Sequence, residues 1–271
     1  MSQNIYDDPD FFAGYAQLPR SRHGLDAAGE WPAIRKLLPP LRGANVVDLG
    51  CGFGWFCRWA RSEGAATVLG VDLSENMLAR AAAGTNDAAV TYRRADLETV
   101  ELPARTFDLA YSSLTLHYVV ELGRLVQRIA AALVPGGSFV CSLEHPTYTA
   151  PRSPGWLETE HGRTWPLDGY LREGPRTTDW LAPGVVKQHR SIGTYVSTFL
   201  AAGFRLTGLV EWAPGDADLV EHPEWDAELD RCPFLLLSAT TSASRTTSAS
   251  RTTSASRTTR TADPTDPAGD Q

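Results

Sequence analysis

A glycine-rich turn at Gly50–Gly54 constrains this chain more than any other stretch. It follows the apolar run Val46–Leu49, and an amphipathic run rich in aromatic residues begins at Phe53. Three glycines at alternate positions allow the backbone to turn tightly and let a ligand lie directly against it. A helix that starts behind them offers unpaired N–H groups and a partial positive charge. The pattern predicts a buried strand, a ligand-binding turn and a helix.

Strand-like and helix-like segments alternate beyond this turn. Such alternation, with nearly continuous apolar strands, indicates an α/β fold whose parallel sheet is covered on both faces. Ligands of these sheets bind at the carboxyl ends of the strands, where the strand order reverses. We predict strands at Val46–Gly50, Thr67–Asp72, Ala89–Arg93, Phe107–Ser112, Ser138–Glu144, Phe204–Trp212 and Pro233–Ala239, and helices at Phe53–Ser62, Glu75–Ala83, Glu121–Leu133 and Ser191–Ala202.

Residues 1–43 precede this core and carry two helical patterns. The first covers Asp10–Leu18 and starts after an Asp-Asp-Pro sequence, and the second covers Glu30–Leu38. Aromatic and basic residues here, Phe12, Tyr15 and Arg20 among them, could form a lid over a bound cofactor. The alternative is simple packing against the edge of the sheet.

Polar residues follow the second and third predicted strands. Asp72 stands 18 residues after Gly54, where a carboxylate can accept both hydroxyls of a ribose. Its alternative role as a helix cap is better filled by Ser74. Asp96 and Leu97 follow the third strand and could frame an adenine ring.

A dinucleotide cofactor is disfavoured by one residue. Nicotinamide and flavin sites use a G-x-G-x-x-G pattern, in which the third glycine lets the helix approach the strand. Here Trp55 stands in that position. A phosphate-binding loop of the Gly-Lys-Ser/Thr type is also absent from the sequence.

An ordered set of motifs resembles the class I S-adenosylmethionine-dependent methyltransferases, close to their type 11 and type 25 small-molecule groups. The resemblance implies a Rossmann-like seven-stranded sheet of order 3-2-1-4-5-7-6 with an antiparallel last strand. It also implies a methyltransferase domain over 44–239. The motifs are Val47–Gly54, Gly70–Ser74, Ala95–Leu97, Phe107–Leu109 and Leu133–Gly137.

The resemblance also implies S-adenosylmethionine as the cofactor. Asp48 would support the turn and the cofactor's amino group, Asp72 would hold the ribose, and Asp96 with Leu97 would frame the adenine. The full set of expected cofactor contacts is Tyr15, Arg20, Asp48, Gly50, Cys51, Gly52, Asp72, Leu73, Asp96, Leu97, Ser112 and His117.

Methyl transfer from a sulfonium is an in-line displacement, so the protein chiefly aligns the reactants and excludes water. A base is needed only for a protonated nucleophile. The candidates are His117, His145 and Tyr15, and His117 is favoured because it follows the fourth strand and imidazole titrates near neutral pH. The alternative for His117 is a helix start or simple packing.

The segment 145–190 is too long for an ordinary connection and is rich in aromatic residues. We predict that it caps the site, with Tyr170–Glu173 and Val185–Arg190 paired as short antiparallel strands. The alternative is an oligomer contact, which leaves a homodimer open. The expected acceptor contacts are Phe12, Tyr118, His145, Trp165, Tyr170 and His189.

The composition limits the classes of partner that the chain is expected to bind. The net charge of −7 and the absence of a basic stripe argue against nucleic acid and anionic membranes. Four cysteines without a CxxC pair and histidines without HxxxH spacing suggest no metal. No signal peptide or membrane-spanning run is evident, so a cytoplasmic location is expected. The repetitive tail 240–271 lacks large apolar residues and is predicted to be disordered.

The expected function is methyl transfer to O, N or C of a small, aromatic or apolar acceptor, such as a quinone, phenol or indole of secondary metabolism. A regulatory protein that binds S-adenosylmethionine without catalysis is one alternative. An NAD-dependent oxidoreductase is another, weakened by Trp55.

Overall fold

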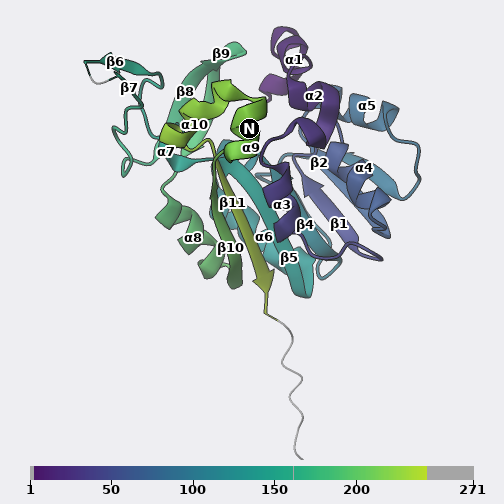
Figure 1. Ribbon diagram of the computed structural model, residues 1–271. Helices are drawn as coiled ribbons and strands as arrows, with labels where there is room; N and C mark the ends of the chain where they lie inside the picture. The colour runs from purple at the N-terminus through teal and green to yellow at the C-terminus, as the bar shows by residue number, and fades with distance from the viewer. Residues whose placement is uncertain (1–2, 161, 243–271) are drawn as a thin grey trace, which may run out of the picture.

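The computed structural model describes residues 3–160 and 162–242 and is centred on a seven-stranded sheet (Figure 1). The strand order is β10-β11-β5-β4-β1-β2-β3, and β11 runs antiparallel to both of its neighbours. This confirms the predicted order, because β10 and β11 are the sixth and seventh strands of this sheet along the chain. The strands are β1 Asn45–Leu49, β2 Thr67–Asp72, β3 Val90–Arg94, β4 Phe107–Ser113, β5 Leu133–Glu144, β10 Phe204–Trp212 and β11 Phe234–Thr241.

β1 is an interior strand of the sheet, and its side chains are buried on both faces. Val46, Val47 and Leu49 have no exposed surface, and β1 pairs in parallel with β2 on one side and β4 on the other. Two apolar layers cover the sheet, as predicted. One contains α3 Trp31–Leu37, α4 Trp55–Ser62 and α5 Glu75–Ala83, and the other contains α6 Leu122–Ala132 and α8 Ile192–Ala201.

The N-terminal segment forms short helices in place of the first predicted one. The helix expected over Asp10–Leu18 ends earlier than predicted, at Tyr15, and Pro19 starts a separate helix with its pre-set φ and missing N–H. Asp8 caps the first helix by accepting the Phe11 N–H at 2.9 Å. The elements, with η for 3-10 helices, are η1 Ile5–Asp7, α1 Pro9–Tyr15, α2 Pro19–His23 and η2 Gly24–Ala27.

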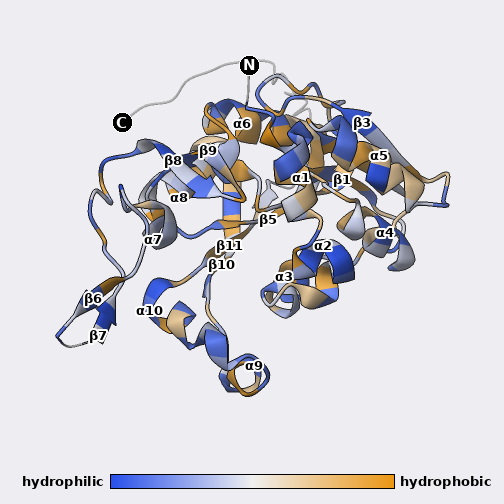
Figure 2. Ribbon diagram, turned by 90° about the horizontal axis from the view of Figure 1, so that it is seen from above, coloured by the Kyte–Doolittle hydropathy of each residue, from blue (hydrophilic) through white to orange (hydrophobic). Residues whose placement is uncertain are grey.

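The segment 145–190, which we call the cap, contains two hairpins. The predicted pairing was wrong in its first strand: Tyr170 and Leu171 lie in a turn closed by Arg172 N–H and Gly169 O, and the strand starts at Gly174. Seen from above, β8–β9 lies near the N-terminal helices, while β6–β7 projects away from the sheet (Figure 2). The elements are α7 Pro146–Thr149, β6 Leu157–Thr159, β7 Gly162–Thr164, β8 Gly174–Trp180 and β9 Ala182–His189.

Short helices that the sequence did not predict connect β10 to β11. They lie above the carboxyl edge of the sheet, close to the cap (Figure 1). β11 extends two residues beyond the predicted boundary, to Thr241, and 243–271 of the predicted tail lie outside the described residues. The connection contains α9 Asp216–Glu221, η4 Pro223–Ala227 and α10 Glu228–Arg231, and η3 Leu116–Tyr118 follows β4.

Candidate functional site

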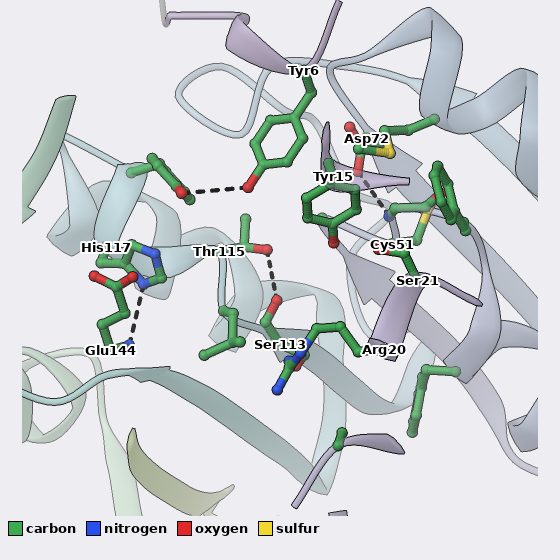
Figure 3. Close-up of a pocket in the computed structure, with 18 of the residues that line it drawn as sticks. Tyr6, Tyr15, Arg20, Ser21, Cys51, Asp72, Ser113, Thr115, His117 and Glu144 are labelled. Atoms are coloured by element: carbon green, nitrogen blue, oxygen red, sulfur yellow. Dashed lines mark hydrogen bonds between the residues drawn. The ribbon is translucent and has the colours of Figure 1, made fainter. Parts of the chain in front are cut away.

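A cavity of about 440 Å³ lies at the carboxyl ends of the central strands, where the sequence predicted a ligand site. Figure 3 shows Cys51 and Asp72 on one side of it and His117 and Glu144 on the other. We call the first side the glycine end, formed by Gly50, Gly52, Asp72, Asp96 and Leu97. We call the other the aromatic end, formed by Glu144, Tyr148, Arg231 and Phe234.

The glycine turn has the geometry that its sequence predicted. Gly50, Gly52 and Gly54 all have positive φ angles, of 80°, 50° and 71°, which L side chains rarely adopt. A Cβ on Gly50 would lie 2.2 Å from Oγ1 of Thr115, so only glycine fits there. A Cβ on Gly52 would meet no atom within 4 Å. The Gly52 main chain therefore faces open space at the cavity wall.

Asp72 at the end of β2 is held by the main chain. One carboxylate oxygen accepts the Gly52 N–H and the other accepts the Ser74 N–H, both at 2.9 Å. Burial raises its pKa, while these hydrogen bonds act in the opposite direction. Each oxygen keeps lone pairs for a ligand. Ser74 caps α5 through the Met77 N–H, as predicted.

Asp48 lies beneath the turn and is nearly inaccessible to water. Its carboxylate accepts from the Cys57 thiol at 3.3 Å, and burial raises its pKa to about 7. Burial also raises the pKa of Cys51, which is hydrogen-bonded with Cys57, to about 11. Leu73, Asp96 and Leu97 complete this end of the cavity as predicted.

Residues 3–8, which we call the strap, cross from the cap to α5. The Gln3 side chain donates to Gly184 O and accepts the Val186 N–H, both at 2.9 Å, on the β8–β9 hairpin. Asp7 accepts from the Ser74 hydroxyl and from the first N–H groups of α5. Tyr6, which lies between these anchors, lines the cavity. No local sequence pattern predicts the strap, because its partners are distant in the chain.

Tyr15 and Arg20 line the cavity, as the lid prediction expected. The Arg20 guanidinium pairs with both oxygens of Glu30, at 2.9 and 3.0 Å. Glu30 is 1% exposed, so this is a buried ion pair. The pair joins α2, which carries Arg20, to the start of α3. It leaves little net charge at this wall of the cavity.

His117 lines the cavity, and its buried environment favours the neutral imidazole. Burial lowers its pKa to about 4, and its Nδ1 accepts the Glu144 N–H at 3.3 Å (Figure 3). A base that works near neutral pH needs a pKa near that value. The geometry therefore favours a positioning role for His117. Tyr118 beside it lines the cavity, and its hydroxyl lies 3.3 Å from that of Tyr6.

Six predicted contacts are not among the residues that line the cavity, so their expected roles stay predictions. Ser112 donates to Leu49 O across the sheet at 2.8 Å, and the Phe12 ring packs edge-on against Phe53. The six are Phe12, Ser112, His145, Trp165, Tyr170 and His189.

The cap members of this set have structural partners. His145 caps α7 and contacts Glu211 at 2.9 Å, and its pKa is lowered by burial. His189 bonds to the Thr149 hydroxyl and to Tyr170 O, and Trp165 donates to Thr147 O. These bonds hold the cap together and join it to β10, and the catalytic role of His145 stays a prediction.

The aromatic end has balanced charges. The Arg231 guanidinium lies 4.7 Å from the ring centroids of Tyr148 and Trp165 and is paired with Glu228. Cation–π contacts of this kind fix a side chain in place. Arg231 and Glu228 lie in the connection between β10 and β11, and Phe234 follows it. These residues were not predicted, because the path of that connection over the site leaves no local sequence signal.

Two searches of the described residues bear on other ligands. In the ranges 3–160 and 162–242, no three His, Cys, Asp or Glu side chains are grouped to hold a metal ion. No helix in the same ranges is long and apolar enough to cross a membrane.

Comparisons with known proteins agree with this geometry. A family model described as a methyltransferase domain matches residues 47–141. The crystal structure of an S-adenosylmethionine-dependent methyltransferase from Mesorhizobium loti is 56% identical, with a TM-score of 0.78, and the match covers 80% of this chain and all of that one.

Two sequence relatives differ in how much of each chain the match covers. An uncharacterized protein of Haemophilus influenzae is 29% identical over 87% of this chain and 96% of its own length. A malonyl-[acyl-carrier protein] O-methyltransferase of Enterobacter lignolyticus is 39% identical, but the match covers only 39% of this chain and 41% of that protein.

Proposed function

This chain belongs to the S-adenosylmethionine-dependent methyltransferases, and on that basis we propose that it methylates a small aromatic or apolar acceptor. The family membership corrects the two alternatives, an NAD-dependent oxidoreductase and a binding protein without catalysis. The observation that supports the acceptor class is the continuity of the cavity. It runs from the glycine turn to a wall that contains Tyr148 and Phe234.

The glycine end fits the cofactor. The Gly52 main chain borders open space, which suits close contact with the methionine portion. Asp72 has lone pairs for the ribose hydroxyls, beyond those used by its two main-chain donors. Asp48 would face the amino group, and Asp96 with Leu97 would frame the adenine, as the family pattern implies.

When bound, the cofactor supplies a sulfonium methyl group that is already activated for displacement. The chain's own task is then to orient the acceptor and to exclude water. Tyr6, Tyr15 and Trp180 are suited to this task, because their rings form one edge-to-face cluster over the cavity. Their electron-rich rings also favour a nearby cation.

The aromatic end would bind the acceptor. Arg231 in this end and Arg20 beside it are both paired with glutamates, so a strongly anionic acceptor meets no free arginine among the described residues of this wall. This favours a neutral ring compound over a malonyl group, although a malonyl-[acyl-carrier protein] O-methyltransferase matches 39% of the chain.

The test is a methyl-transfer assay with labelled S-adenosylmethionine and two acceptor panels. One panel contains phenols, quinols and indoles, and the other contains malonyl thioesters and short aliphatic acids. We expect label to enter the aromatic panel. Transfer to the malonyl thioesters alone would overturn the proposed acceptor class.

A further inference from the structure

Glu144, the last residue of β5, has an unusual carboxylate in the wall of the cavity. Its Oε1 accepts from the Lys187 ammonium at 2.5 Å, while its Oε2 is buried and has no hydrogen-bond partner among the described residues. Burying a polar atom without a partner costs about 1–3 kcal/mol. A ligand group that donates a hydrogen bond to this atom would remove that cost.

Several neighbouring polar groups have partners other than Oε2. The His117 Nδ1 accepts the Glu144 main-chain N–H, and the Tyr118 hydroxyl is shared with Tyr6. The Arg231 guanidinium is paired with Glu228. None of these contacts satisfies Oε2, and Glu144 lines the cavity, so a molecule bound there is a source of a donor for this atom.

The local charge limits what that molecule can be. Lys187 is 4% exposed, and its ammonium lies 5.2 Å from the Trp180 ring centroid, so it remains beside Glu144 and balances its charge. A cationic acceptor would add an uncompensated charge and would also be repelled by the sulfonium. A neutral O–H or N–H group supplies a hydrogen bond without that cost.

We propose that Glu144 selects the acceptor by accepting a hydrogen bond from its neutral hydroxyl or N–H group. Glu144 is thus a specificity-determining residue at the aromatic end, opposite the glycine turn in Figure 3. The inference rests on the proposed function, because it specifies the acceptor of that same reaction.

The test compares two ligands that differ by one donor, 2-naphthol and 2-methoxynaphthalene. Each is titrated by calorimetry into protein saturated with S-adenosylhomocysteine. We expect the wild type to bind the naphthol roughly tenfold more tightly, because a hydrogen bond to a charged group is worth about that factor or more. Equal binding of the two ligands would overturn the role of Glu144 and leave the aromatic acceptor class intact. Binding of neither would overturn both.

Glu144→Gln sharpens the result. Lys187 would orient the amide oxygen toward itself, so the NH₂ group would replace Oε2 and could no longer accept from a hydroxyl. We expect the preference for naphthol to disappear while the affinity for S-adenosylhomocysteine stays within twofold. A retained tenfold preference would contradict the proposal.

Two further variants control for folding. Glu211→Gln makes the same change outside the cavity wall, on a half-exposed side chain, and should keep the preference. If Glu144→Gln does not fold, Glu144→Leu/Lys187→Met removes both charges of the pair, which is better tolerated than removing one, and leaves no acceptor atom at this position. This double variant should also lose the preference, and its retention would overturn the proposal.

Discussion

The two ends of the cavity are built in different ways. The glycine end comes from consecutive strand–turn–helix units, and its polar groups are held by nearby main-chain atoms, as Asp72 is by Gly52 and Ser74. The aromatic end is assembled from β5, α7, α10 and the start of β11, which are distant in the chain. Because the glycine end is built from neighbouring segments, its geometry toward the cofactor is set locally. The aromatic end is built from distant segments, so substitutions there can change the acceptor without disturbing the glycine turn.

The largest expected effect comes from breaking the buried ion pair that borders the aromatic end. Arg20→Leu leaves Glu30 buried and unpaired, which should lower the free energy of unfolding by about 3–5 kcal/mol in urea denaturation. Arg61→Leu is the control, since its partner Asp87 is exposed and such pairs contribute about 0–1 kcal/mol.

The double variant Arg20→Leu/Glu30→Leu should recover most of this loss, because no unpaired charge remains. Similar losses for Arg20→Leu and Arg61→Leu would show that burial does not set the strength of this pair.

The next effect concerns the glycine end alone. Asp72→Ala removes hydrogen bonds from a carboxylate, each worth about 1.5–3 kcal/mol, so the affinity for S-adenosylmethionine should fall at least about 100-fold in calorimetry. Asp216→Ala, an exposed change on α9, should bind normally. A dissociation constant for Asp72→Ala within threefold of wild type would remove the ribose role.

A smaller effect is expected where the strap joins the two ends. Asp7→Ala releases the strap from α5 by removing hydrogen bonds of about 1 kcal/mol each. We expect S-adenosylmethionine to dissociate roughly tenfold faster in stopped-flow measurements. Asp10→Ala, on an exposed position of α1, is the matched control. Equal dissociation rates would mean that the strap does not retain the cofactor.

The smallest effect is a proton released at Asp48, whose pKa burial raises to about 7. A cation that binds beside this carboxylate stabilises its charged form and lowers its pKa. Binding of S-adenosylmethionine near pH 7 should therefore release a fraction of a proton, and affinity should rise with pH through this range. Calorimetry in buffers of different ionisation enthalpy measures the release. Asp48→Asn should abolish it, and an unchanged release would assign the proton elsewhere.

The contrast between the locally built glycine end and the aromatic end built from distant segments explains what the sequence could predict. The turn at Gly50–Gly54, Asp72 and the α5 cap depend on local rules of φ, capping and strand ends, and the structure has them where expected. The strand order came from an ordered motif set rather than from periodicity.

The site residues that the sequence did not predict share one physical property. Gln3, Glu144 and Arg231 acquire their roles through partners far away in the chain, which no local pattern reveals. His145 and His189 have residue types that suit catalysis, but their rings are used to hold the cap together. Aromatic content predicted a cap over the site, but it did not indicate which of the aromatic rings in that segment line the cavity.

The place of β11 in the sheet has a consequence for folding. β11 lies between β5 and β10, although both precede it in the chain. During synthesis, β10 therefore has no neighbour in the sheet, and one edge of β5 stays open, until residues 234–241 have been made. Pairings between distant segments form slowly, and open edges invite association with other chains. The last strand to be synthesised thus decides when the nascent sheet stops being prone to aggregation.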